Sequence, residues 1–410
     1  MNRHDSRSPD DLSSQEWRAL VDSVFRPGPA DRRLLLLTDL PDPEGGRRPD
    51  HPAWRARRSM VAAWAERLAS AFGAGDEDDR LEVVLGVYRN VGTNNADLPA
   101  RAWRVDPASL ASSNLAHGGL LDDAAAVDLH ELLESADLVL APTELSTTAP
   151  LKLLAPRLGF RAATMPGFRR DMLPALRLDY DEVDRRVRRL AALLTAADRA
   201  ELAFDADGLE CRLTLDLRGR SAHASGGLVR EVGQAGNLPS GEAYIVPYEG
   251  ERPGEPSRSA GTMPVELDGE LLLYTIEQNR AVAVRSRGLA DGGEGPRLDS
   301  ERNRLRAEPA YANLAELGLG VLGPMGVEPI GVVLLDEKLG LHIAFGRSDH
   351  FGGTVGAADF TSPDTVVHID RVYLPSLQPR VTVRAVDLVD ADGTRRELMR
   401  DGEYVVALDL

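Results

Sequence analysis

Histidine and acidic side chains gather in one short part of the chain, between Leu334 and Asp370. This stretch holds His342, His350 and His368, three of the eight histidines in the 410-residue chain. Neutral imidazole nitrogens and carboxylate oxygens are donors that proteins use to bind zinc, manganese, cobalt or ferrous iron. The stretch therefore predicts a metal-binding site.

The spacing within the sequence VHID at 367–370 adds a geometric argument. Its apolar residues are typical of a strand, where residues i and i+2 project from the same face, so His368 and Asp370 are expected side by side. His342 lies in a second apolar run of strand length, where a lone histidine is more often a hydrogen-bonded core residue than a ligand. Placed in one sheet, the two strands would offer two imidazoles and one carboxylate, a set typical of ferrous iron sites.

Two glutamates upstream extend this set. Glu242 follows the turn sequence NLPSG and begins an apolar strand, although an ordinary strand-entry residue is the alternative. Glu316 is the lone charge in the apolar run from Tyr311 to Val327. A carboxylate in such surroundings must be paired, protonated or metal-bound, because burial of a bare charge is costly. Three carboxylates and two imidazoles would suit a pair of divalent ions.

The elements that must position these residues follow two patterns along the chain. In the first half, strand-like apolar runs at 33–40, 81–88, 137–141 and 160–165 alternate with segments of helical periodicity. The stretch 181–202 reads as a long amphipathic helix. This alternation predicts an α/β layer with a largely parallel sheet. Beyond residue 204, short β-like runs separated by turn signals predict a β-rich region.

We therefore predict an α/β fold class with three parts. These are a disordered tail at 1–15, an N-terminal α/β domain at 16–204 and a C-terminal β-rich metal-binding domain at 205–410.

The composition limits the partners and the compartment. A net charge of −17 spread along the chain argues against nucleic acid or an anionic membrane as the main partner. No apolar run approaches the roughly 20 residues of a membrane span, and the polar first residues do not resemble a signal peptide. The single cysteine, Cys211, suits a reducing compartment. We expect a cytoplasmic protein with a small-molecule or short-peptide substrate.

Four segments, taken in order, resemble the aminopeptidase T family of dinuclear metallopeptidases, also called the thermophilic metalloprotease family. They are NLPSGE at 237–242, AELGLG at 315–320, LLDEKLGLHIAFG at 334–346 and VVHID at 366–370. Carried over position by position, the resemblance implies metal ligands at Glu242, Glu316, His342, His368 and Asp370. It implies two zinc, cobalt or manganese ions, a homodimer, and a hydrolase that removes N-terminal residues from short peptides through a metal-activated water.

The chain differs from that family at the position of one catalytic residue. The family has a catalytic tyrosine shortly after the HIAFG strand, whereas this chain reads RSDHF at 347–351. His350 is our candidate general acid or base in its place, because the ordinary histidine pKa lies near neutrality. Glu316 is the candidate bridging carboxylate. Lys338 or Arg347 is the candidate for stabilising an oxyanion, and the alternative for Lys338 is a surface charge paired with Glu337.

A second resemblance is to the ring-cleaving 2,5-dihydroxypyridine dioxygenases, which use the same scaffold with a single ferrous iron. Their metal set carries over to His342, His368 and Asp370, and the segment RAATMPGFRRDMLPAL at 161–176 is also similar to that branch. The alternative function is therefore a mononuclear iron dioxygenase. A non-catalytic relative that binds a peptide is a third hypothesis.

Overall fold

A computed structural model of the chain describes residues 11–41, 52–73, 80–112, 121–293 and 295–408. The chain divides into two compact units. The first comprises Met1–Asp181 and Gly227–Ser240, and the second comprises Glu182–Gly226 and Gly241–Leu410.

The first unit is built on a seven-stranded sheet in the order β10-β6-β5-β1-β2-β3-β4. Strands β10, β6, β5, β1 and β2 are parallel, and the short β3 and β4 extend the sheet in antiparallel pairs. The strands are β1 (Arg33–Leu40), β2 (Glu82–Arg89), β3 (Arg101–Arg104), β4 (Val127–Asp128), β5 (Leu138–Ala141), β6 (Arg161–Thr164) and β10 (Ala235–Asn237).

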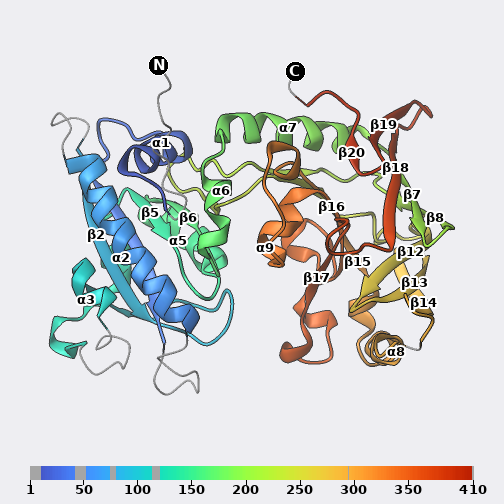
Figure 1. Cartoon of the computed structure of the whole chain (residues 1–410), viewed down its shortest axis with the longest axis horizontal. Helices are drawn as coiled ribbons and strands as arrows, with labels where there is room; N and C mark the ends of the chain where they lie inside the picture. The colour runs from blue at the N-terminus through green and yellow to red at the C-terminus, as the bar shows by residue number, and fades with distance from the viewer. Residues whose placement is uncertain (1–10, 42–51, 74–79, 113–120, 294, 409–410) are drawn as a thin grey trace. The chain divides into compact units, whose positions relative to one another are not determined.

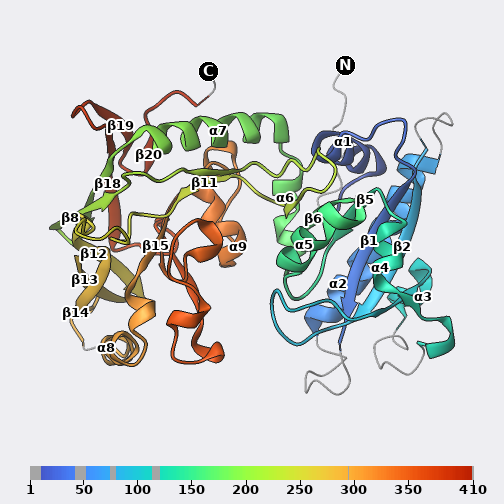
Figure 2. The ribbon, with the colours of Figure 1, turned by 180° about the vertical axis from the view of Figure 1, so that it is seen from behind.

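Helices cover both faces of this sheet, with α2 on one face and α4 and α5 on the other (Figures 1 and 2). The helices are α1 (Ser14–Phe25), α2 (Pro52–Gly73), α3 (Pro107–Ala111), α4 (Leu129–Glu134), α5 (Thr148–Leu158) and α6 (Leu173–Leu176). Because both faces are covered, β1 is buried from Leu34 to its end, which explains its continuous apolar sequence.

The first described residues cap helix α1 and contact helix α2. Ser13 caps helix α1 in a capping box with Glu16, and Trp64 donates a hydrogen bond from Nε1 to the buried Asp11. Helix α1 and its cap thus begin inside the predicted tail at 1–15, whose disorder stays a prediction. Residues 1–10 of this tail lie outside the described residues.

The second unit contains two antiparallel sheets. One has the order β17-β16-β15-β11-β9, and the other has the order β14-β13-β12-β8-β7-β18-β19-β20. The strands of the five-stranded sheet are β9 (His223–Ser225), β11 (Glu242–Ile245), β15 (Leu314–Gly320), β16 (Leu341–Gly346) and β17 (His368–Val372). Those of the eight-stranded sheet are β7 (Arg199–Ala206), β8 (Leu209–Asp216), β12 (Ala260–Leu267), β13 (Glu270–Glu277), β14 (Arg280–Leu289), β18 (Val381–Val389), β19 (Arg395–Arg400) and β20 (Glu403–Tyr404).

An aromatic core joins these two sheets. The ring of Phe345, on β16, lies 5.1 Å from that of Tyr274 on β13 and 5.3 Å from that of Tyr311. This unit also contains the helices α8 (Arg297–Ala307) and α9 (Val333–Asp336) and most of α7 (Tyr180–Ala196). One face of the five-stranded sheet thus packs against this aromatic core.

The predicted fold class, α/β with a β-rich C-terminal region, is confirmed. The predicted helix at 181–202 is too long, because α7 ends at Ala196 and β7 begins at Arg199. From there burial alternates with a period of two, because successive side chains of a strand point to opposite faces of the sheet. Strand β7 pairs with β18 on one side and β8 on the other. Whether the chain forms two domains with a boundary at 204/205 stays a prediction. None of the helices in the described ranges has the length and apolar character of a membrane span.

Candidate metal centre

The register of the five-stranded sheet brings the predicted ligands to one face. Ala344, on β16, pairs with Glu316 on one side and with Asp370 on the other. In the next row, His342 pairs with Gly318. Directly opposed residues of antiparallel strands project to the same face, as do residues two apart along a strand. By the same rule Glu242, opposite Gly320, and His368, opposite Gly346, share this face.

Small residues between the ligands leave room for the side chains to converge. A Cβ added to Gly318 would lie 1.9 Å from Nε2 of His342, so the imidazole lies directly over this glycine. A Cβ added to Gly320 would lie 2.1 Å from the carbonyl carbon of Lys338. Because Gly318 and Gly320 have no side chains, the ring of His342 and the backbone of Lys338 can approach β15 at these two positions.

Glu316 lies between the two imidazoles. Its Oε1 is 3.1 Å from Nε2 of His342, and its Oε2 is 3.1 Å from Nε2 of His368. Asp370 Oδ1 is 3.4 Å from Nε2 of His368, and Glu242 Oε2 is 3.6 Å from Nε2 of His342. Two groups of candidate ligands result, Glu242–Glu316–His342 and Glu316–His368–Asp370, with Glu316 common to both.

The ring of His368 is oriented by the backbone. Its Nδ1 lies 2.8 Å from the carbonyl oxygen of Arg347, and since a carbonyl only accepts, Nδ1 is the donor. The other nitrogen, Nε2, faces Glu316 and Asp370. A histidine held in this way presents Nε2 to a metal, and the carbonyl is the partner that metal-ligating histidines usually have.

Lys338 occupies the Glu242 side of the centre. Its Nζ donates to Oε1 of Glu242 at 2.6 Å and also to Glu337, and its side chain is only 2% exposed. The predicted pairing with Glu337 is confirmed, but the predicted surface location is wrong. Burial alone lowers the pKa of Lys338, whereas the two carboxylates raise it well above its ordinary value, so the ammonium stays charged.

The centre carries an excess of negative charge. Burial would lower the pKa of His342, but the hydrogen bond and charge of Glu316 and the charges of Glu242 and Asp370 raise it to about 9. The pKa of His368 is raised for the same reasons, with its hydrogen bond to Asp370 contributing most strongly against burial. Carboxylates that stabilise the protonated imidazoles would also stabilise a divalent cation that replaces the added protons.

Unsatisfied polar atoms support the fit to a metal. Glu242 Oε2 and His342 Nδ1 are buried and lack a hydrogen-bond partner among the described residues. Unpaired buried polar atoms are rare in folded proteins and call for an explanation such as a bound ion. With imidazole and carboxylate donors converging, the residues present fit a divalent metal site.

His350 lies beside the centre, outside both ligand groups. It belongs to the short 3-10 helix Asp349–Phe351, and its ring centroid is 5.5 Å from that of His368. Burial, with the charges of His368 and Arg347, lowers the pKa of His350 to about 4. Phe351 packs against the same ring of His368 at 5.2 Å. The roles of His350, Glu316 and Lys338 in catalysis stay predictions.

Two features of the centre were missed from the sequence, and a third was placed differently. Glu337 was predicted as a surface partner of Lys338, but its side chain is 14% exposed, and burial, opposed by Lys338, raises its pKa to about 8. The Arg347 carbonyl could not be found, because backbone groups leave no trace in a sequence. Gly318 and Gly320 did leave a signal, since they follow Glu316 at the two-residue period of its strand.

Comparisons with known proteins support the fold and not the first resemblance. No protein-family model and no curated protein matches the chain, so the aminopeptidase T resemblance has no support. Among solved structures, the chain is similar to 2,5-dihydroxypyridine dioxygenase from Pseudomonas putida KT2440. That match has a TM-score of 0.55 and 15% sequence identity, and it covers 96% of this chain and 97% of that chain. The chain shares its fold with a ring-cleaving dioxygenase.

Proposed function

We propose that the protein is a mononuclear metal-dependent dioxygenase that acts on a dihydroxylated aromatic ring. The observation that carries the proposal is the Lys338 ammonium on the Glu242 side of the centre. It compensates the charge of Glu242 and Glu337, so a single divalent ion is needed on the remaining side, near Glu316, His368 and Asp370. The shared fold with a dioxygenase over nearly the whole chain supports the same reaction class.

His368 and Asp370 would hold the metal together with Glu316, and His342, on the other side of Glu316, would be the second imidazole of the site. A ferrous ion bound there supplies redox chemistry and open coordination positions, as in other sites with two histidines and one carboxylate. The chain's own residues prepare the centre. The Arg347 carbonyl holds the proton on Nδ1 of His368, and Lys338 keeps Glu242 paired.

Neighbouring groups complete the proposed site. Phe351 and Tyr244, whose ring centroids lie 4.8 Å apart, offer an aromatic wall near His368. An aromatic substrate can stack on such rings. His350 is a candidate proton acceptor for a substrate hydroxyl, on the basis of its position beside His368.

The test is reconstitution of the purified protein with Fe²⁺ under anaerobic conditions. We expect about one iron per chain by elemental analysis, and oxygen uptake in an electrode cell only when 2,5-dihydroxypyridine or a related dihydroxylated ring is added. His368→Ala should abolish both. His130→Ala is the matched control, because this exposed histidine lies on α4 in the other unit. Iron binding without ring-dependent oxygen uptake across such rings would refute the reaction.

A two-metal hydrolase is the second candidate, favoured by the position of Glu316 between two groups of ligands. A carboxylate that bridges two ions is typical of sites that activate a water for hydrolysis. Two zinc, cobalt or manganese ions per chain, with release of N-terminal residues from short peptides and no oxygen uptake, would establish this function and exclude the first.

A further inference from the structure

The segment 347–355, here called the edge segment, borders the candidate metal centre. Its first residue supplies the carbonyl that accepts the Nδ1 proton of His368, and Phe351 packs against the same imidazole. The direction of His368 therefore depends on where the edge segment lies. Internal hydrogen bonds, such as those from the backbone nitrogens of Ser348 and Asp349 to the carbonyl of Val355, close the segment on itself, and the nitrogen of Arg347 donates to the carbonyl of Val367 at 2.9 Å. The position of this closed loop over the centre depends on the further contacts that tie it to the rest of the unit.

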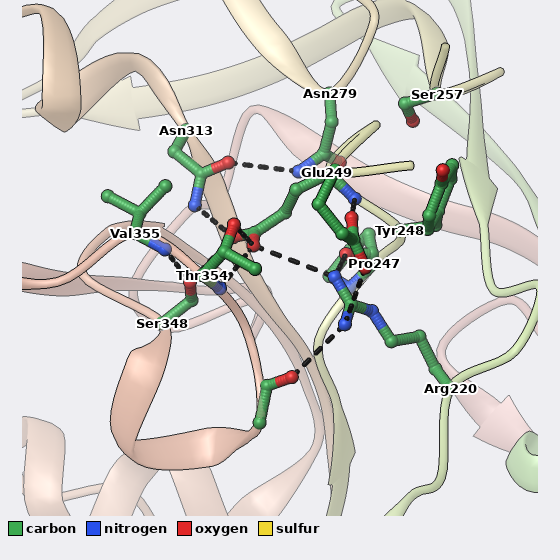
Figure 3. Close-up of polar contacts among 12 residues, drawn as sticks. Arg220, Pro247, Tyr248, Glu249, Ser257, Asn279, Asn313, Ser348, Thr354 and Val355 are labelled. Carbon is green, nitrogen blue, oxygen red and sulfur yellow. Dashed lines mark hydrogen bonds and ion pairs between the residues drawn. The ribbon is translucent and has the colours of Figure 1, made fainter. Parts of the chain in front are cut away.

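One carboxylate contacts both ends of the edge segment (Figure 3). Oε1 of Glu249 accepts hydrogen bonds from Ser348 Oγ at 2.5 Å and from Asn313 Nδ2 at 2.7 Å. Oε2 accepts from the backbone nitrogen of Thr354 at 2.6 Å and from its Oγ1 at 2.8 Å. The Glu249 side chain is 4% exposed. Four donors thus satisfy the two oxygens of one buried carboxylate.

Asn313 extends this contact to the residue before the edge segment. Its Nδ2 also donates to the carbonyl of Gly346 at 3.1 Å, while its Oδ1 accepts from Asn279 at 3.1 Å (Figure 3). Gly346 and Ser348 flank Arg347. Both neighbours of the carbonyl that binds His368 are therefore tied to Glu249, one directly and one through Asn313.

Arg220 provides a third point of attachment. Its Nη1 donates to the carbonyl of Gly352 at 3.1 Å, in the middle of the edge segment, and its Nη2 lies 3.6 Å from Oε2 of Glu249. Arg220 also pairs with Glu251 at 3.0 Å. The guanidinium compensates the buried charge of Glu249 and binds the same segment, so the carboxylate and the cation act together.

We propose that Glu249 is a positioning residue, which anchors the edge segment and through the Arg347 carbonyl sets the orientation of His368. Its effect on metal binding rests on the proposed metal centre, whereas the anchoring rests on the contacts alone. Groups that orient metal-ligating histidines typically change metal affinity 10- to 100-fold. No such role was predicted for Glu249 from the sequence.

Glu249→Gln is the sharpest variant, because it keeps the shape and removes one acceptor. The backbone nitrogen of Thr354 and Nδ2 of Asn313 can only donate, and they bind different oxygens of Glu249. A glutamine must point its own amide hydrogens at one of them. Asn313 cannot turn over without losing its bonds to Gly346 and Asn279. One end of the edge segment should therefore detach.

A matched control exists in the same unit. Glu308 is also a buried carboxylate that accepts a backbone N–H, from Thr361, and two threonine hydroxyls, from Thr361 and Thr365. All three donate to Oε2, and Oε1 has no hydrogen-bond partner among the described residues, so the carbonyl oxygen of a glutamine can keep these bonds. Glu308→Gln should therefore leave the edge segment unchanged. Thr354→Val is a milder variant that removes one hydroxyl donor and keeps the fold if Glu249→Gln does not.

Two measurements on the full chain decide the inference. Hydrogen–deuterium exchange of the metal-free protein should be at least about tenfold faster across 347–355 in Glu249→Gln, with Thr354→Val intermediate and Glu308→Gln like the wild type. Zn²⁺ affinity, measured by competition with a chelator, should fall about 10-fold or more in Glu249→Gln alone. Unchanged exchange overturns the anchoring, and faster exchange with unchanged affinity overturns the positioning of His368.

A wild-type chain that binds neither Zn²⁺ nor Fe²⁺ would refute the proposed function separately. The ring N–H signal of His368 in ¹⁵N-histidine NMR spectra then decides the inference. A slowly exchanging Nδ1–H in the wild type that is lost in Glu249→Gln supports the positioning role. A signal that is the same in both proteins overturns it.

Discussion

Replacing Lys338 with methionine tests how many cations the centre needs. The ammonium lies between Glu242 and Glu337, and its side chain is 2% exposed, while those of the glutamates are 10% and 14% exposed. Methionine preserves the length and volume of the aliphatic chain and removes the charge. In Lys338→Met the two carboxylates face each other without a cation, in surroundings where water has little access.

The expected cost is large because both partners are buried. Removing one member of a buried ion pair destabilises a protein by about 3–5 kcal/mol. Burial already raises the pKa of Glu337 to about 8 against the effect of Lys338, so this carboxyl can take up a proton and remove one charge. We therefore expect the lower end, about 3 kcal/mol, or a fall of about 6–12 °C in the melting temperature of the second unit.

The assay combines thermal unfolding with metal analysis. Metal-free Lys338→Met should unfold at the lower temperature, and the variant should then bind one more divalent ion per chain than the wild type, at the freed oxygens of Glu242. Lys152→Met is the control, because the only other lysine is exposed on α5 and should change stability by less than about 0.5 kcal/mol. A wild-type chain that already binds two ions, or a Lys338→Met variant as stable as the control, refutes the reasoning.

Three further outcomes are expected. Gly318→Ala places a methyl group where the ring of His342 lies, so this variant should lose metal binding. Gly73→Ala is its control, because no neighbouring atom lies within 4 Å of the new Cβ. Equal metal affinity in the two variants contradicts the geometry. Fe²⁺ or Zn²⁺ at 100 times its Kd should stabilise the wild type by about 2.7 kcal/mol, reversibly with a chelator, and His368→Ala should show no such gain. Burial would raise the pKa of Glu308, but its hydrogen bonds from Thr365 and Thr361 lower the pKa overall. The ionised carboxylate therefore stabilises the fold above the unfolded pKa of about 4.3, and this stabilisation is lost as the pH falls. In urea unfolding, the free energy of unfolding of Glu308→Gln should fall less in acid than that of the wild type, and an equal fall in both contradicts this.

Much of the centre could be predicted because strands have a simple period. The two-residue spacing of His368 and Asp370 gave their common face, and the apolar runs around Glu316 and His342 gave two buried strands. The register between those strands could not be predicted. A β-bulge between Leu314 and Glu316 shifts the pairing with β16, and this shift places Glu316 opposite Ala344. Without it Glu316 would face the opposite side of the sheet.

The surroundings of the centre were harder to predict than its ligands. The role of Glu249 could not be predicted, because nothing local distinguishes a buried carboxylate from an exposed one in a run of polar residues. Its bonds to Asn313, Ser348 and Thr354 span 64, 99 and 105 residues. Contacts at such separations depend on the assembled sheets, so neither periodicity nor composition reveals them.

The order of these partners along the chain has a consequence for biosynthesis. The three residues that donate hydrogen bonds to the Glu249 carboxylate lie C-terminal to it, the last by 105 residues, whereas its ion-pair partner Arg220 lies N-terminal to it. At translation rates of about 5–20 residues per second, Glu249 is made roughly 5–20 s before Thr354. During that interval Glu249 can pair with Arg220, which is already made, but it lacks its full set of hydrogen-bond donors. The proposed metal centre can form only after its last candidate ligand, Asp370, has also been made, so an ion would enter it late relative to the folding of the first unit.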